Sequence, residues 1–235
     1  MNCRVVICRP QPGADASAAR ARTHGLTPVI YPLFSIEPVQ WNPPDPRTFD
    51  AVMLTSANAT RHAGANLMLY SEWPIFAVGD ATANAANNAG LSDVQVAGPN
   101  AGALAQEIER AGYRNILHLC GEEVRPFDPG ALNITHVPVY RTIEAGDATG
   151  LAATTESGSI ILAHSPKAAA RLKALVPTST RHDLSLIAIS QAALAAAGTG
   201  WRDAQATDEP SDSAMLALAH QICQEGGVAS SRGII

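Results

Sequence analysis

Small polar residues and a few cations stand directly after short apolar runs in this chain of 235 residues, at positions suited to binding an anion. Ligands of parallel α/β domains bind at the carboxyl ends of strands, beside helix N-termini. Unpaired backbone N–H groups, hydroxyls and the positive helix end attract negative charge there. We therefore expect carboxylates to bind at Arg9, Thr55, Ser56, Ala57, Asn58, Gly79, Thr82, Gly121, Arg125, Ser165, Pro166, Lys167, Ser190 and Gln191.

Each of these residues also has a simpler interpretation. Ser, Gly and Asp just before a helix are N-cap residues, and Pro166 fits the first helical position after Ser165. A single Arg or Lys on a turn is commonly a solvated surface cation. A binding site is therefore indicated by the whole set rather than by any one member.

Tyr140 is the candidate for chemistry. It stands in an extended segment, residues 136–143, that we expect to connect two domains. A phenol there can donate a proton or a hydrogen bond to a departing hydroxyl group. The alternative is an amphipathic side chain that packs at a hinge, and the residues alone leave both interpretations open.

Motifs for a cofactor, a metal or a nucleophile are absent from the sequence. No GxGxxG opens a helix, and no GxxxxGK[ST], GxSxG or HExxH occurs. The four cysteines, Cys3, Cys8, Cys120 and Cys223, form no CxxC pair and have no histidine at ligand spacing. We therefore predict no cofactor and no metal, and four buried thiols in a reducing compartment.

The bulk properties exclude several classes of protein. A net charge of −5 without a basic cluster argues against a nucleic-acid partner, whose footprint is a basic face. No apolar run approaches the ~20 residues of a membrane-spanning helix, and the N-terminus lacks the shape of a signal peptide. We predict a cytoplasmic, globular protein with no membrane partner.

One unit repeats along the chain: a short apolar run, a small polar turn and an alanine-rich helix. The alternation predicts an α/β fold, with parallel sheets covered by helices on both faces. Residues 51–108 and 159–222 follow the same plan, which indicates an internal duplication. Helices are expected near residues 14–23, 59–69 and 213–224, and the C-terminal tail beyond them is expected to be mobile.

Two segments interrupt this repeat, and we expect them to cross between two domains. Residues 31–50 are rich in proline, and residues 136–148 contain a second extended piece. Two crossings make one domain continuous and the other discontinuous. We predict an inserted α/β domain with its linker strands at residues 36–143, a discontinuous domain from 1–35 with 144–235, and an active-site cleft between them.

An ordered set of short motifs covers nearly the whole chain. Residues 5–10 are similar to a V-x-x-T-R-P opening, with Cys8 in place of threonine, and residues 138–142 match a V-Y-x-T interdomain strand. Turns similar to T-S-x-x-A, V-G-x-x-T-A, R-G-x-x-x-R and S-x-x-A follow in order at residues 55–59, 78–83, 120–125 and 165–168. In this order the motifs resemble those of the uroporphyrinogen-III synthase (HemD-like) family.

The resemblance implies two similar flavodoxin-like, three-layer domains joined by a two-stranded β linker. It implies a lyase of haem biosynthesis that cyclises hydroxymethylbilane, a linear tetrapyrrole with eight carboxylates. The substrate loses its hydroxyl as water, ring D is inverted through a spiro intermediate, and uroporphyrinogen III results. Uncatalysed closure gives the uninverted isomer I, so the enzyme acts largely by orienting its substrate.

The resemblance also implies roles for single residues and partners. The tyrosine that matches Tyr140 assists departure of the hydroxyl, and the turns bind carboxylates largely through backbone amides. A monomer is implied, with transient contact with the preceding enzyme of the pathway. Two departures stand out: Cys120 replaces an arginine, and residues 190–193 read Ser-Gln-Ala-Ala where many relatives carry Gly and Thr.

A different function class fits the same features. A non-catalytic two-domain binder of a small anion, closing by hinge motion, would also carry duplicated domains and polar turns. The absent signal-peptide shape and the V-Y-x-T match disfavour it. A nucleotide-dependent transferase or oxidoreductase is disfavoured because the phosphate loops are absent.

Overall fold

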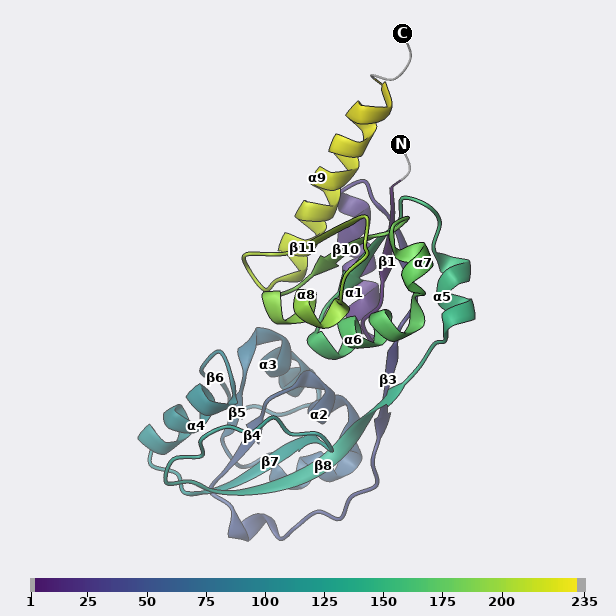
Figure 1. The fold of residues 1–235 in the computed structure, drawn as a ribbon. Coiled ribbons are helices and arrows are strands. Elements are labelled where there is room, and N and C mark those ends of the chain that lie inside the picture. The colour runs from purple at the N-terminus through teal and green to yellow at the C-terminus, as the bar shows by residue number, and fades with distance from the viewer. Residues whose placement is uncertain (1–2, 232–235) are drawn as a thin grey trace. The chain divides into compact units, whose positions relative to one another are not determined.

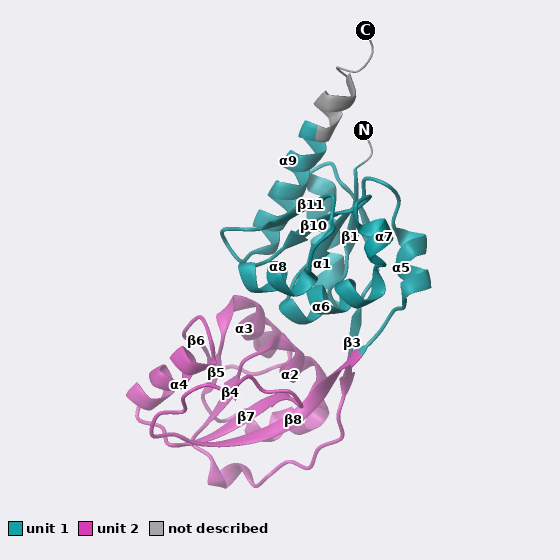
Figure 2. Ribbon diagram, in the orientation of Figure 1, with its two compact units in different colours: residues 1–35, 144–235 teal, residues 36–143 magenta. Residues whose placement is uncertain are grey.

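Two compact α/β units make up the described part of the chain. The computed structural model describes residues 3–231, with the side chains of the last helix described as far as Glu225. Unit 1 combines residues 1–35 with 144–235, and unit 2 spans residues 36–143 (Figure 2). Each unit contains a sheet of parallel strands covered by helices, which confirms the predicted α/β class.

Unit 1 holds a five-stranded sheet in the order β2-β1-β9-β10-β11, with all neighbours parallel. Its strands are β1 (Arg4–Ile7), β2 (Thr27–Ile30), β9 (Ile160–Ala163), β10 (Ser185–Ala188) and β11 (Asp203–Ala206). Its helices are α1 (Gly13–Thr23), α5 (Ala148–Thr154), α6 (Pro166–Leu175), α7 (Thr178–Arg181), α8 (Gln191–Ala197) and α9 (Asp212–Ser231) (Figure 1).

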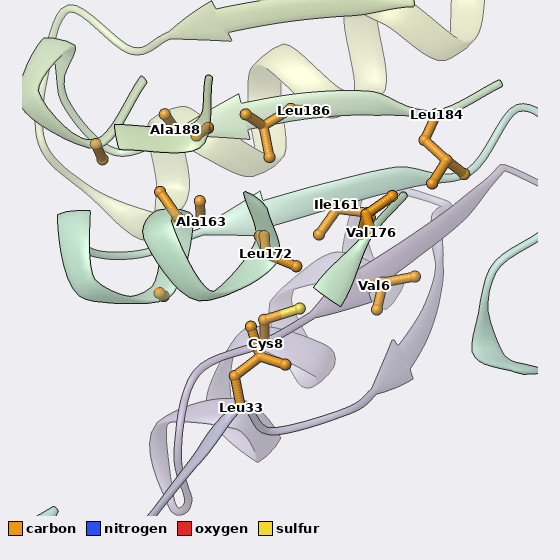
Figure 3. Packing of buried hydrophobic residues seen from close by; sticks show 14 of the residues in the cluster. Val6, Cys8, Leu33, Ile161, Ala163, Leu172, Val176, Leu184, Leu186 and Ala188 are labelled. Carbon is orange, nitrogen blue, oxygen red and sulfur yellow. The ribbon is translucent and has the colours of Figure 1, made fainter. Parts of the chain in front are cut away.

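Helices cover both faces of the unit 1 sheet. On one face, Leu172 of α6 packs with Val6 and Ile161 of the sheet (Figure 3). On the other face, Met215 of α9 packs in a cluster with Ile7. Val6 and Ile7, neighbours in β1, therefore pack in the cores on opposite faces of the sheet, as the alternation of side chains along a strand requires.

Unit 2 is built around a six-stranded sheet in the order β3-β8-β7-β4-β5-β6. Its strands are β3 (Phe34–Pro38), β4 (Ala51–Leu54), β5 (Ile75–Ala77), β6 (Val94–Val96), β7 (Asn115–Gly121) and β8 (Asn133–Glu144). Its helices are the 3-10 helix η1 (Pro46–Thr48), α2 (Ala57–His62), the 3-10 helix η2 (Gly64–Tyr70), α3 (Gly79–Asn88) and α4 (Ala101–Arg110). The chain passes between the units within β3 and within β8.

The core of unit 2 also lies on both faces of its sheet. Val52 and Leu54 of β4 pack with Ala59 of α2 on one face. Met53, between them, packs with Leu104 of α4 on the other. All pairs among β4 to β8 are parallel.

The two sheets share one spatial plan, as the predicted duplication requires. Strands β9, β10 and β11 occupy the same successive positions in their sheet as β4, β5 and β6 in theirs. Strands β1 and β2 correspond in the same way to β7 and β8, although they come first in the chain. In each sheet, successive strands are added outward in opposite directions from one switch point. This point lies between β1 and β9 in unit 1 and between β4 and β7 in unit 2.

Several predicted elements differ from the structure. One helix was expected over residues 59–69, but α2 ends at His62 and a 3-10 helix follows. Gly64 adopts a φ of 68°, a left-handed conformation that ends an α-helix. Helix α9 continues to Ser231 where an unstructured tail was expected, and the predicted tail beyond residue 231 lies outside the described residues.

The cysteines also correct a prediction. Cys3 and Cys223 form a disulfide across 220 residues, with their Cα atoms 6.0 Å apart. A pair this distant in sequence carries no local signal. Cys8 and Cys120 are buried thiols as predicted, and burial raises the pKa of Cys8 to about 12 and that of Cys120 to about 11. Among residues 3–231, no helix has both the length and the apolar character needed to cross a membrane.

Candidate active site

A cavity of about 610 Å³ lies at the carboxyl ends of β4 and β7 in unit 2. The growth of the sheet reverses between these two strands, which is where ligands bind in open α/β sheets. It is lined by the residues after β4, by the end of β7 and the residues that follow it, by the start of α4, by Val78 after β5 and by one residue of β8. Five predicted site residues are among them: Thr55, Ser56, Gly121, Arg125 and Tyr140.

Tyr140 reaches this cavity because of an irregularity in the pairing of β7 with β8. The register shifts between Cys120 and Gly121, so that Gly121 pairs with Tyr140. A Cβ atom at Gly121 would lie 2.9 Å from ring atoms of Tyr140, which is too close for any side chain. Glycine at position 121 is thus what allows the phenol ring to occupy its position.

Thr55 is held by a buried histidine. Its Oγ1 lies 2.9 Å from Nε2 of His118, and Nδ1 of His118 lies 2.9 Å from Nδ1 of His136 on the neighbouring strand. Burial, with His136 as a second cause, lowers the pKa of His118 to about 3. His118 is therefore neutral near pH 7 and fixes the direction of the Thr55 hydroxyl.

Cys120 lies beside the same histidines. Candidate ligand atoms of His118, Cys120 and His136 all lie within 4.8 Å of one another. The expectation that no histidine stands at ligand spacing from a cysteine was therefore wrong. His118 and Cys120 alternate on one strand, and the strand pairing adds His136 opposite His118.

The other predicted residues of unit 2 do not line this cavity. Ala57 and Asn58 belong to the first turn of α2, where the Ser56 hydroxyl accepts a hydrogen bond from the Asn58 backbone N–H at 3.2 Å. Gly79 begins α3 with a φ of 72°. Thr82 is only 5% exposed, so it offers little surface to a ligand.

In unit 1 the corresponding strand ends hold a charged network around Asp212. This first residue of α9 accepts hydrogen bonds from Ser17 Oγ at 2.6 Å, His164 Nε2 at 2.7 Å and Arg20 Nε at 2.8 Å. Arg9 Nη1 lies 3.6 Å away. Burial raises the pKa of Asp212, but the hydrogen bonds outweigh it and hold the pKa far below its usual range. The guanidinium of Arg9, a predicted carboxylate ligand, is thus already engaged.

The remaining predicted residues of unit 1 begin two helices. Ser165 and Ser190 are N-caps whose hydroxyls accept from the backbone N–H groups three residues on, at 3.1 and 3.3 Å. Pro166 is the first residue of α6, as predicted. The Nζ of Lys167 lies 5.6 Å from the centre of the Phe34 ring, and Gln191 is exposed at the start of α8.

Residues 15–217 match the family model HEM4, described as uroporphyrinogen-III synthase HemD. The chain belongs to the uroporphyrinogen-III synthase family. It is therefore a cyclising lyase of tetrapyrrole and haem biosynthesis, as the ordered motifs predicted.

Solved structures of uroporphyrinogen-III synthases share the fold of the chain. The enzyme of Helicobacter pylori superposes with a TM-score of 0.65 at 17% identity, covering 94% of this chain and 100% of that one. A mutant enzyme of Thermus thermophilus gives a TM-score of 0.50 at 15% identity, covering 95% and 99%. No curated protein matches the sequence. At these identities the similarity shows the fold alone.

Sequence reasoning overlooked three polar residues of this synthase-family chain. His118 interrupts an apolar strand, His164 directly follows β9, and Asp212 begins α9. A polar residue inside or directly after a buried strand is a usable signal, because its burial requires a partner. His164 directly precedes the S-x-x-A turn at residues 165–168, yet only the structure shows its bond to Asp212.

Proposed function

We propose that this family member closes hydroxymethylbilane to uroporphyrinogen III, with inversion of ring D and loss of water, and that Tyr140 assists the loss of the hydroxyl. One observation supports this assignment above all. Tyr140, Thr55 and Ser56 line a single cavity at the point where the unit 2 sheet reverses its growth. A polar, concave site with a phenol at its wall suits an anionic substrate that must lose a hydroxyl.

Tyr140 donates a hydrogen bond, and then the proton, to the departing hydroxyl of the substrate. The electron push comes from the pyrrole nitrogen, so no cofactor is required of the chain. The leaving group departs as water, and the substituted carbon of ring D attacks the resulting azafulvene to give the spiro intermediate. Cleavage of the other bond to that carbon and reclosure at the free α carbon invert ring D, and the proton released on closure returns to Tyr140. Gly121 supports this step by leaving room for the ring of Tyr140, and orientation supplies most of the selectivity.

Carboxylates of the substrate bind to the polar turns at the strand ends. In unit 2 these are Thr55, Ser56 and Arg125 in the cavity, with Ala57, Asn58, Gly79 and Thr82 on adjoining turns. In unit 1 they are Arg9, Ser165, Pro166, Lys167, Ser190 and Gln191. A helix N-terminus such as that of α6 contributes about 0.3–1 kcal/mol to a nearby anion, and a charge-assisted hydrogen bond about 1.5–3 kcal/mol. Several such contacts hold a polyanion without a basic surface.

We propose a monomer in the cytoplasm that binds a linear tetrapyrrole and contacts the preceding enzyme of the pathway only transiently. The redox state of Cys3 and Cys223 tests the proposed compartment, because a reducing compartment would keep these thiols reduced rather than paired in a disulfide. A thiol titration of unfolded protein, with and without reductant, would count the free cysteines directly.

Incubation with hydroxymethylbilane, followed by separation of the product isomers, tests the reaction. We expect isomer III to form faster than isomer I appears in a control with heat-inactivated protein. Isomer I alone, at the uncatalysed rate, would contradict the proposal. A thermal shift with a small sugar or amino acid, and none with a porphyrinogen, would instead favour the non-catalytic anion binder.

A further inference from the structure

Three side chains with metal-binding atoms gather beside the cavity of unit 2. His118 and Cys120 are alternate residues of β7 and therefore point to the same face of the sheet. His136 pairs with His118 in the register of β7 and β8. One ligand atom of each residue lies within 4.8 Å of the other two. We propose that His118, Cys120 and His136 bind one divalent cation of the zinc class.

The donor set favours this class of metal. Two imidazole nitrogens and one thiolate suit zinc, whereas magnesium and calcium prefer oxygen ligands. Three protein ligands with a fourth position for water or an exogenous group is the arrangement of an open zinc site. Because His118 and Cys120 also line the cavity, a ligand oxygen can reach that fourth position from it.

The surroundings of His118 prepare it for this role. Its Nε2 lies 2.9 Å from Oγ1 of Thr55 and its Nδ1 lies 2.9 Å from Nδ1 of His136. The proposed site uses the tautomer in which Nε2 donates to Thr55 and the Nδ1 lone pair is directed at His136. Metal-bound histidines are commonly fixed in this way, by a hydrogen bond from the second ring nitrogen. Phe127 packs edge-on against both imidazoles, with its ring centre 6.2 Å from each, and helps to fix their positions.

Binding replaces protons that the metal-free group holds. In this tautomer His136 donates from Nδ1 to Nδ1 of His118, 2.9 Å away, and the metal takes the place of that proton. The proton moves by way of solvent from Nδ1 to Nε2 of the exposed His136 ring, so the neutral ring offers its Nδ1 lone pair to the metal. The thiol of Cys120 loses its proton to solvent on binding. Tetrahedral zinc requires a nitrogen–nitrogen separation of about 3.3 Å and nitrogen–sulfur separations of about 3.6 Å. Binding therefore requires a small rotation of His136, with the ligand atoms, which lie within 4.8 Å of one another, closing on the ion.

Titration of the metal-free protein with Co²⁺, a spectroscopic substitute for zinc, tests the site. We expect one Co²⁺ per chain, the visible bands of a tetrahedral ion, and a thiolate-to-cobalt charge-transfer band. Cys120→Ser removes the charge-transfer band. His136→Ala weakens binding at least tenfold, and because this side chain is exposed the variant folds. Circular dichroism verifies the fold of each variant.

Two matched controls separate this site from the other metal-binding groups of the chain. The double variant Cys3→Ser/Cys223→Ser, which removes the two cysteines of the disulfide, keeps the charge-transfer band. His182→Ala, at a 70% exposed side chain in unit 1, keeps the wild-type affinity. Absence of the band in the wild type, its persistence in Cys120→Ser, or an unchanged affinity in His136→Ala would each overturn the proposal. These outcomes do not depend on whether the chain converts hydroxymethylbilane.

Discussion

Gly121 offers the sharpest test of how the cavity positions Tyr140. In Gly121→Ala the new Cβ would lie 2.9 Å from Cε2 and Cζ of the Tyr140 ring and 3.2 Å from its hydroxyl oxygen. Carbon atoms in contact are separated by about 3.5–4.0 Å. The ring must therefore retreat by roughly 0.6–1.1 Å, or β8 must shift with it.

A displacement of this size has two measurable consequences. Misplacement of a catalytic group by about 1 Å costs on the order of a hundredfold in rate. Overpacking of a well-packed position costs about 1–3 kcal/mol in the free energy of unfolding. We therefore expect Gly121→Ala to form isomer III about 10–100 times more slowly, and to unfold at a lower urea concentration.

The assay is the rate of isomer III formation, measured with saturating hydroxymethylbilane and corrected for spontaneous isomer I. Gly102→Ala is the matched control, because Gly102 lines the same cavity but its added Cβ meets nothing closer than 3.5 Å. In a Tyr140→Ala background, Gly121→Ala should have little further effect on the rate. A wild-type rate in folded Gly121→Ala would refute the assigned role of the Tyr140 ring.

Three further predictions concern unit 1. Asp212→Asn should lower the free energy of unfolding by about 1.5–3 kcal/mol at pH 7. Because the pKa of Asp212 is depressed on folding, this difference from wild type should shrink as the pH falls below about 4. A difference in urea unfolding that stays constant from pH 7 to 3 would contradict this. Reductant should lower the melting temperature of the wild type and its free energy of unfolding by about 2–5 kcal/mol. It should leave the melting temperature of Cys3→Ser/Cys223→Ser unchanged. Equal responses of the two proteins would argue against the disulfide. Ser165→Ala removes the N-cap of α6 and should lower the free energy of unfolding by about 1 kcal/mol, whereas Ser165→Asn should keep the cap and the stability. A raised KM in stable Ser165→Asn would then show a role of the Ser165 hydroxyl in substrate binding apart from capping.

Periodicity and turn chemistry predicted most of the fold. Most apolar runs form buried strands, although β6 is largely exposed. Ser56, Ser165 and Ser190 are N-caps, and the repeated order of strands and helices forms two sheets of the same plan. These signals are local, since each depends on residues within one turn or one strand. Family motifs in a fixed order then supplied the reaction, which no local pattern could.

Features that depend on contacts across the chain were not predictable in the same way. The Cys3–Cys223 bond joins residues 220 positions apart. The approach of His136 to His118 depends on the register of β7 and β8, and the contact of Tyr140 with Gly121 depends on a shift in that register. Arg9 looked like a free cation in the sequence because its partner Asp212 lies on a helix at the other end of the chain.

Substitution of Tyr140 by phenylalanine tests the central claim most directly. The substitution keeps the ring above Gly121 and removes only the hydroxyl, so the fold and the cavity should be retained. A single-turnover measurement of isomer III formation from hydroxymethylbilane should show a rate more than about tenfold below wild type, as expected for the loss of a general acid. A wild-type rate in Tyr140→Phe would contradict the account and remove Tyr140 from the mechanism.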